Sequence, residues 1–475
     1  MTSASICWYD FETFGSDPRR DRASQFAGIR TDENLNIIGD PLVLYCQPSP
    51  DFLPNPMACL ITGITPQKAL SEGVCEAEFI RLIHAEFAKG STCVAGYNSI
   101  RFDDELTRQL LYRNFYDPYE REWKNGNTRW DILDMARLAA ATRPEGVVWP
   151  KREDGTNSFR LEALTAANGI EHADAHDALS DVLATIEMAR LIKQAQPRLF
   201  DYVYRSRTKQ AVRRQLDLKS PKPLLHVSGM YPPAQGCLAV VMPVCLHPTD
   251  SNGVIVYDLR LDPDTWADLS EEEIKMRLFT PSEQLPEGIC RIPLKTIHTN
   301  KCPILTTPTV LPPESALQYG VSEERIRAHW KKMKEIPDLA QKVTNALRRE
   351  DLPRPDDPDF MLYSGGFFND GDKELMRVVR KTNALELARL DLPFKDGRLK
   401  EMFFRYRARN FPRTLTEDES ERWRLFCRQR IDSTESRVSY AEDLEKAKTM
   451  ADLSQLESLS QLEHYVLEFS EQESN

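Results

Sequence analysis

The segment ICWYDFETFG (residues 6–15) places two carboxylates inside an apolar, aromatic run. Such a run is typical of a buried β-strand, and Gly15 ends it. Asp10 and Glu12 stand two positions apart, so their side chains leave the same side of a strand. Buried like charges repel one another, and a bound cation is the simplest way to stabilise the pair. An exposed edge strand could also carry this pattern by chance.

A second acidic cluster follows in GYNSIRFDDELTR (residues 96–108). Asp103 and Asp104 stand where a helical pattern begins, a place where negative charge suits the helix dipole. Helix capping would explain both carboxylates. A third oxygen ligand for a hard divalent ion such as Mg²⁺ is the other interpretation.

The third cluster is AHDALSDVLAT (residues 175–185). In one regular helix, His176 and Asp181 would point about 140° apart. They can meet only if His176 lies in the turn before the helix while Asp181 lies inside it. Asp177 and Ser180 favour helix starts, which permits that geometry. The spacing therefore predicts a turn and then a helix.

In order and spacing, the three clusters resemble the DEDD superfamily of 3′→5′ exonucleases, in the branch that uses a histidine as general base. The resemblance implies that Asp10, Glu12, Asp103 and Asp181 hold two Mg²⁺ ions, with Mn²⁺ as a substitute, and that His176 deprotonates the attacking water. Asp104 has no such role in the motif.

Longer segments, among them YDFETFG, LITGITPQ, NKCPIL and FRYRARNFP, resemble the exonuclease I family. The resemblance implies an RNase H-like exonuclease domain with a mixed α/β sheet over residues 1–197, an SH3-like β-rich domain over 198–354 and a helical domain over 355–475. It implies processive degradation of single-stranded DNA to 5′-mononucleotides in DNA repair and recombination. It also implies a monomer and recruitment by single-stranded DNA-binding protein.

The residue patterns favour the same organisation. Strand patterns fill the first 50 residues, strand–helix alternation follows, and short apolar segments between prolines mark residues 198–350 as β-rich. SFRLEALTAANGI predicts a helix with an N-cap at Ser158 and a stop at Gly169. DLPRPDDPDF (residues 351–360) predicts a linker, and helical periodicity with an acidic tail after about residue 466 follows.

The composition is that of an ordinary globular protein of 475 residues. There is no secretory signal pattern and no apolar run of the ~18 residues that a membrane span needs. The ten cysteines form no C-x-x-C pair, so we expect reduced thiols and a cytoplasmic protein without membrane contact.

The net charge of −11 conceals two basic stretches. Residues 198–222 carry eight basic residues against two acidic ones, and residues 398–413 carry six against one. Each stretch could be a solvated face. Together, with aromatics among the second set, they predict a groove for single-stranded nucleic acid. The predicted strand contacts are Arg108, Tyr119, Trp123, Arg137, Arg143, Phe159, Arg160, Lys209, Asn252, Lys295, Asn300 and Tyr363.

Two other functions compete with this one. An exoribonuclease or a proofreading exonuclease would use the same five residues, but it would need little beyond the first 200 residues. A catalytically inactive protein that binds single-stranded nucleic acid is the alternative from another class. All five catalytic positions carry the required residue types, which argues against it.

Overall fold

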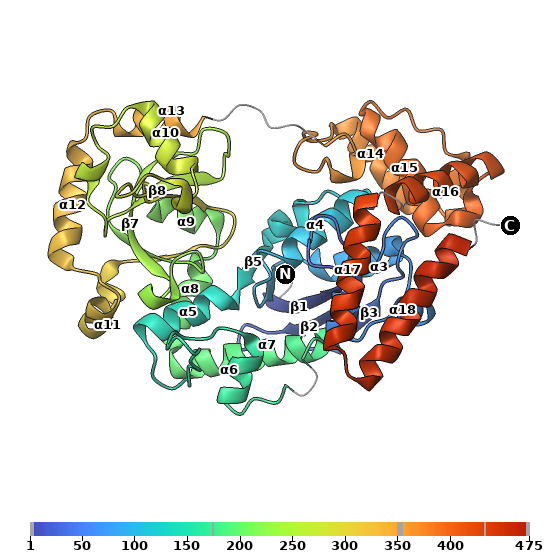
Figure 1. The fold of residues 1–475 in the computed structure, drawn as a ribbon, viewed down its shortest axis with the longest axis horizontal. Coiled ribbons are helices and arrows are strands. Elements are labelled where there is room, and N and C mark those ends of the chain that lie inside the picture. The colour runs from blue at the N-terminus through green and yellow to red at the C-terminus, as the bar shows by residue number, and fades with distance from the viewer. Residues whose placement is uncertain (1–3, 173–174, 349–354, 432–433, 472–475) are drawn as a thin grey trace. The chain divides into compact units, whose positions relative to one another are not determined.

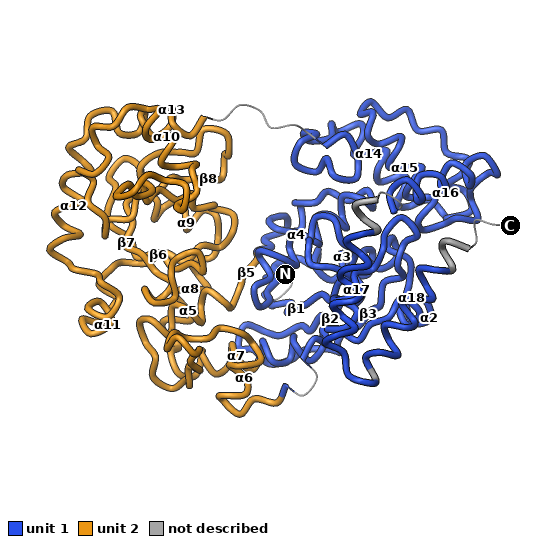
Figure 2. The backbone as a smooth tube through the Cα atoms, in the orientation of Figure 1, with its two compact units in different colours: residues 1–128, 172–186, 353–475 blue, residues 129–171, 187–352 orange. Residues whose placement is uncertain are grey.

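The computed structural model describes residues 4–172, 175–348, 355–431 and 434–471 (Figure 1). The chain divides into two compact units (Figure 2). Unit 1 comprises residues 1–128, 172–186 and 353–475, and unit 2 comprises residues 129–171 and 187–352. The first and last parts of the chain therefore belong to one unit. No helix in the described parts is long and apolar enough to cross a bilayer.

A mixed sheet carries the first acidic cluster. Its order is β3-β2-β1-β4-β5, with β1 antiparallel to β2 and parallel to β4. The strands are β1 (Ser5–Thr13), β2 (Ala23–Thr31), β3 (Leu42–Tyr45), β4 (Thr92–Gly96) and β5 (Thr128–Asp131). The predicted mixed α/β sheet is confirmed.

Strand β1 is buried on both faces, which explains its continuous apolar and aromatic sequence. On one face Tyr9 lies 5.0 Å from the ring of Phe87 and Phe11 lies 5.0 Å from that of Phe26, between ring centroids. The period of two residues puts Asp10 and Glu12 on the other face, with Trp8. The aromatic cluster thus fixes which way the two carboxylates point.

Helices α3 (Glu76–Phe87) and α4 (Asp103–Arg113) supply buried side chains to the same core as β1. Unit 1 also contains α1 (Pro56–Thr62), α2 (Pro66–Glu72), the start of α7 (Ala178–Ala195), α14 (Asp370–Lys381), α15 (Gly397–Asn410), α16 (Glu417–Ile431), α17 (Thr434–Met450) and α18 (Leu453–Glu471). The C-terminal part is helical, as predicted.

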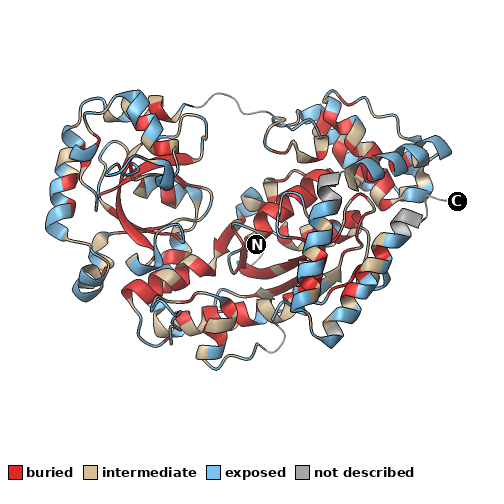
Figure 3. Ribbon diagram, viewed as in Figure 1, coloured by how far each residue is buried: buried red, intermediate tan, exposed pale blue. Residues whose placement is uncertain are grey.

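The C-terminal helices share cores with the first 128 residues. Leu444 of α17 and Leu459 of α18 are buried in one cluster with Cys59 and Leu60 of α1. Met402 and Tyr406 of α15 belong to a second cluster with elements of the first 128 residues. In Figure 3 the buried residues run through these helices as well as the sheet. Unit 1 is therefore held together by apolar contacts between the two ends of the chain.

The described end of the predicted linker at 351–360 is packed and not an open connection. Residues 351–354 lie outside the described residues. Pro358–Phe360 form a short 3₁₀-helix, and Asp359 within it is 1% exposed. Its carboxylate pairs with Arg405 and Arg409, so the proline- and aspartate-rich end of the segment packs into unit 1.

The second basic stretch, 398–413, is not an exposed basic face, and that part of the prediction is wrong. Arg398, Arg405 and Arg407 are buried, and the side chain of Arg409 is only 3% exposed. Their carboxylate partners are Asp396, Asp357, Asp359, Glu401, Glu419 and Asp51. Three of these partners, Asp51, Asp357 and Asp359, lie about 40 or more residues before the stretch, so counting charges within it cannot find them.

Unit 2 contains a second sheet of order β10-β6-β7-β8-β9, antiparallel throughout. Its strands are β6 (Leu224–Val227), β7 (Leu238–Leu246), β8 (Gly253–Asp258), β9 (Leu294–His298) and β10 (Ile304–Thr306). The predicted β-rich character of this region is confirmed. The helices are α5 (Ile132–Thr142), α6 (Leu161–Ala167), the end of α7, α8 (Pro197–Ser206), α9 (Lys209–Gln215), α10 (Glu271–Phe279), α11 (Pro313–Gln318), α12 (Glu323–Glu335) and α13 (Leu339–Leu347).

One predicted helix boundary is wrong. Helix α6 has Arg160 as its N-cap, not Ser158. The backbone N–H of Ser158 instead donates to the carbonyl of Pro150 at 2.8 Å, which holds this residue in the preceding loop. Gly169 follows the C-cap with a φ of 65°, so the predicted stop is confirmed.

Candidate active site

Asp10 and Glu12 lie near the end of β1, where Glu12 is buried and Asp10 is partly buried. Burial, with Asp181 and Asp103 nearby, raises the pKa of Glu12 to about 9. Burial, with Asp103 and Glu12 nearby, raises the pKa of Asp10 well above its usual value. The protein therefore holds these carboxylates where neither solvent nor a neighbouring cation stabilises their negative charge.

The first turn of α4 brings Asp103 to the same strand. Its Oδ1 accepts a hydrogen bond from the backbone N–H of Phe11 at 3.1 Å, which places Asp103 between the two β1 carboxylates along the strand. Asp104 is held elsewhere, because Tyr9 donates its hydroxyl to it at 3.0 Å and Arg121 forms a buried ion pair with it. The two adjacent acids thus have different surroundings.

His176 and Asp181 meet in the way that their spacing predicts. Helix α7 begins at Ala178, so His176 lies in the preceding turn and Asp181 lies inside the helix. The backbone N–H of His176, which has a φ of 70°, donates to Asp181 Oδ2 at 3.3 Å. Asp177 Oδ1 accepts from the backbone N–H of Leu179 at 3.1 Å and caps the helix.

Glu12, His176 and Asp181 converge. A carboxylate oxygen of Glu12, one of Asp181 and a ring nitrogen of His176 all lie within 4.8 Å of one another. The charges of Asp103, Glu12 and Asp181 all contribute to the raised pKa of Asp10, so the fourth carboxylate belongs to the same site. Carboxylate oxygens are the ligands that hard divalent cations prefer, and a cation would relieve this repulsion. The residues fit a divalent metal.

Two further residues position the third cluster, and sequence reasoning missed both. Gln25 of β2, opposite Glu12, donates to Asp177 Oδ2 at 3.0 Å and accepts from the backbone N–H of Ala178 at 3.1 Å. His172 Nε2 lies 2.6 Å from Asp181 Oδ1. A glutamine inside an apolar strand is unusual, and this pattern could have indicated a functional role for Gln25. Nothing in the sequence distinguished His172 from a structural histidine.

Four predicted strand contacts lie in unit 1. Arg108 is buried, and its Nε donates to Glu122 at 2.7 Å. Its guanidinium lies 5.8 Å from the ring centroid of Tyr119. Trp123 is 65% exposed and Tyr363 is 51% exposed. The aromatic residues therefore offer surface for stacking, whereas Arg108 is committed to an internal ion pair.

The other eight predicted contacts lie in unit 2. Arg137 lies 5.8 Å from the ring centroid of Phe159, and Arg143 donates to the carbonyl of Val310 at 2.9 Å. Lys295 Nζ lies 4.0 Å from the ring centroid of Tyr231. Arg160 and Lys209 are exposed, whereas Asn252 and Asn300 are partly buried. These eight residues belong to unit 2, whereas the acidic cluster belongs to unit 1.

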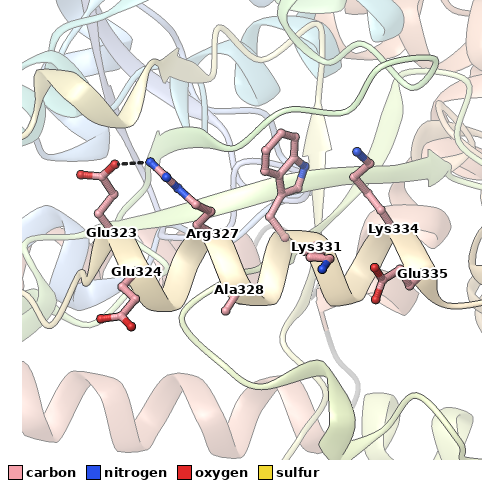
Figure 4. A pocket seen from close by; sticks show the side chains of 8 residues that line it. Glu323, Glu324, Arg327, Ala328, Lys331, Lys334 and Glu335 are labelled. Carbon is pink, nitrogen blue, oxygen red and sulfur yellow. Dashed lines mark hydrogen bonds and ion pairs between the residues drawn. The ribbon is translucent and has the colours of Figure 1, made fainter.

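A hollow of about 1030 Å³ lies along α12 in unit 2 (Figure 4). Its lining side chains all come from this one helix, and they include three glutamates besides arginine and lysine. Arg327 pairs with Glu323 at 2.8 Å. Mixed charges on an open helix face do not converge on one point, so this hollow is no candidate for the catalytic site.

Comparisons with known proteins match three family domains in chain order. The family described as exonuclease matches residues 7–189, the exonuclease I SH3-like domain matches residues 207–349, and the exonuclease I C-terminal domain matches residues 356–469. The three expected domain types are therefore present.

Individual relatives match over almost the whole chain. Exodeoxyribonuclease I of Escherichia coli strain K12 is 44% identical over 443 residues, 93% of each protein. Exonuclease I of Methylocaldum szegediense has 48% identity and a TM-score of 0.93, over 98% of this chain and 99% of that one. A zinc-bound complex of E. coli exonuclease I with single-stranded DNA has 43% identity and a TM-score of 0.94, over 99% and 100%. The chain belongs to the exodeoxyribonuclease I family.

Proposed function

We propose that this protein is a 3′→5′ exodeoxyribonuclease that degrades single-stranded DNA processively to 5′-mononucleotides in DNA repair and recombination. The observation that carries the proposal is the convergence of Glu12, Asp181 and His176 within 4.8 Å, with Asp10 on the same strand as Glu12 and Asp103 hydrogen-bonded to the backbone of that strand. Relatives that carry the exodeoxyribonuclease name, and one solved with single-stranded DNA, support DNA as the substrate.

Asp10, Glu12, Asp103 and Asp181 would hold two Mg²⁺ ions, with Mn²⁺ as a substitute. Bound divalent ions supply charge neutralisation at the scissile phosphate and lower the pKa of water. The zinc-bound relative supports a divalent metal at this site. The hydrogen bond from the Phe11 backbone to Asp103 and the anchoring of α7 by Gln25 keep the carboxylates in place as the charge of the site changes.

His176 would act as the general base. Its turn is exposed, so a water molecule can reach the ring, and one ring nitrogen already lies close to Glu12 and Asp181. The nitrogen takes the proton of the attacking water, and the neighbouring carboxylates stabilise the imidazolium that results. The positive φ of His176 turns its backbone N–H toward Asp181, which fixes the side chain at the start of α7.

The strand would bind through phosphate pairing and base stacking on the twelve predicted contact residues. Tyr363 and Trp123 have the exposed aromatic surface for stacking, and Arg160 and Lys209 have exposed charge for phosphates. Arg108 would have to exchange Glu122 for a phosphate or act by holding Tyr119.

The proposal extends to organisation and setting. The domain boundaries remain 1–197, 198–354 and 355–475, which the three matched family ranges support. We expect a cytoplasmic monomer that single-stranded DNA-binding protein recruits. The exoribonuclease alternative is disfavoured because the matches to exonuclease I relatives continue far beyond the exonuclease domain.

The test is digestion of 5′-labelled single-stranded DNA, RNA and duplex DNA, each with and without Mg²⁺. We expect a Mg²⁺-dependent ladder that shortens from the 3′ end on single-stranded DNA only. His176→Ala should lower the rate about 10²–10⁴-fold through loss of the base. Asp181→Ala should be at least as severe through loss of a metal ligand.

Glu78→Gln is the matched control, because Glu78 is an exposed carboxylate on α3 that pairs with Arg81. Its rate should equal that of the wild type. Full activity of Asp181→Ala, or digestion of RNA as fast as DNA, would overturn the assignment.

A further inference from the structure

Arg19 lies in the loop that follows the first acidic strand, and its guanidinium approaches Tyr363 from a distant part of the chain. The distance from Arg19 Cζ to the ring centroid of Tyr363 is 5.5 Å. The Arg19 side chain is 67% exposed. Arg19 lies over the ring, and an aromatic ring together with an exposed cation is what proteins use for single-stranded nucleic acid, where a base stacks and a phosphate is paired.

Glu105 holds this arrangement together. Its carboxylate accepts the hydroxyl hydrogen of Tyr363 at 2.5 Å and lies 3.6 Å from Arg19 and 3.5 Å from Arg108. Glu105 belongs to the first turn of α4, two residues after Asp103. The first turn of α4 therefore positions both Asp103 of the acidic cluster and Glu105, which contacts Arg19 and Tyr363.

The two arginines around Glu105 differ in what they can bind. Arg108 is buried and is also paired with Glu122 at 2.7 Å, so its charge is compensated inside the protein. Arg19 is exposed, and its ion pair with the shared Glu105 spans 3.6 Å. A guanidinium has five N–H donors in a planar fork that suits phosphate, and the exposed side of Arg19 leaves donors for it.

More exposed aromatic surface is linked to the pair through Arg108, which shares Glu105 with it, and Tyr119. Phe367 is 85% exposed, and its ring lies 6.0 Å from that of Tyr119, edge to face. Tyr119 in turn lies beneath the guanidinium of Arg108. Single exposed aromatic side chains are common, but a group of them is more typical of a binding surface. Aromatic rings grouped with an exposed arginine suit a ligand that has both phosphates and planar bases, as a nucleic acid strand does.

We infer that Arg19 is a phosphate-binding residue for the DNA strand, acting beside a base stacked on the Tyr363 surface. The inference rests on the proposed function, since it assumes a single-stranded DNA substrate. Glu105 is a positioning residue in this view: it orients Tyr363 and keeps Arg19 near the ring without neutralising it closely. Arg19 thereby adds a contact to those that the sequence predicted.

The test is binding of a fluorescent oligo(dT) without divalent metal, so that no hydrolysis occurs, across 50–300 mM salt. Arg19→Ala should raise the Kd about 5–10-fold at 100 mM salt. It should also reduce the slope of log K against log salt by about 0.7, the value for one phosphate contact on a single strand. Arg19→Lys should keep the slope of the wild type but lose part of the affinity, because lysine keeps the charge without the planar fork.

The control is Arg81→Ala, which removes an exposed arginine of the same unit that pairs with Glu78 on α3. It should leave the Kd within 2-fold of the wild type. If Arg19→Ala binds with the Kd and slope of the wild type, or no worse than Arg81→Ala, Arg19 is only a surface cation and the inference is wrong. If the wild type itself does not bind oligo(dT), the proposed function fails instead, so the two failures are distinguishable.

Discussion

The two basic stretches have similar composition and opposite structures. Residues 398–413 direct four arginines into buried ion pairs, whereas in residues 198–222 all of the basic side chains except that of Arg207 are exposed. Buried Asp51 and Asp359, which lie outside the stretch in sequence, make the difference by pairing with Arg409. A local charge count therefore indicates that cations are present, but the fold decides whether they face solvent or other residues.

The buried arginines also explain why the C-terminal helices belong to unit 1. Asp51 pairs with Arg22 of the N-terminal part and with Arg409 and Arg430 of the C-terminal part. Each charge of such a network is costly to bury and is tolerated because its partners are also buried. The network makes the C-terminal helices a structural part of the unit that carries the acidic cluster.

Removing one carboxylate of this network should have the largest effect. Asp359→Ala leaves Arg405 and Arg409 buried with one counter-charge fewer, and we expect the free energy of unfolding to fall by about 3–5 kcal/mol. Urea unfolding followed by circular dichroism measures this. Asp201→Ala, in the exposed stretch, is the control and should change stability by less than about 0.5 kcal/mol. Equal effects of the two variants would contradict the comparison.

Acid should weaken the same junction between N- and C-terminal parts. The ring of His84 lies 4.5 Å from that of Tyr116, on which Arg380 of α14 also lies. Burial and the charge of Arg380 lower the pKa of His84 to about 4. The unfolded chain, with a usual pKa of about 6.5, binds this proton first, so stability is complete above about pH 6.5 and falls as the pH drops toward 4.

The expected loss between pH 7 and pH 4.5 is on the order of 2–3 kcal/mol from this group. Urea titrations at the two pH values measure it, and His84→Gln should remove that part of the difference. The carboxylate of Asp359 does not interfere in this window, because although burial raises its pKa, Arg409 and Arg405 hold it well below the usual range. An unchanged pH dependence in His84→Gln would show that His84 is not the group responsible.

The sequence predicted those features that depend on local pattern. The position of His176 in a turn and of Asp181 inside α7 follows from helix periodicity, and the carboxylates of β1 follow from strand periodicity. The helical C-terminus and the β-rich middle also follow from local periodicity. These inferences need only a few neighbouring residues.

The features that it missed depend on partners far away in sequence. Gln25 contacts Asp177 across 152 positions, and Arg409 contacts Asp51 across 358 positions. The division into units is of the same kind, because apolar contacts of α17 and α18 with α1 join the two ends of the chain. Ser158 was mistaken for a helix cap because its hydrogen bond to Pro150 depends on a loop conformation.

The smallest expected effect concerns how much each basic stretch contributes to DNA binding. Arg213→Ala with Arg214→Ala removes two exposed cations of the first stretch, and we expect the salt slope of oligo(dT) binding to fall by about 1.4 and the Kd to rise on the order of 10-fold. Lys400→Ala with Arg413→Ala removes the two exposed cations of the second stretch and is the charge-matched control. Its Kd should stay within about 2-fold of the wild type: the other arginines of that stretch are paired inside unit 1, so the stretch offers only these two exposed cations and forms no basic surface for the strand. The comparison fails if the control loses as much affinity as Arg213→Ala with Arg214→Ala. The second stretch would then contact the strand through its exposed residues, although its other arginines are buried.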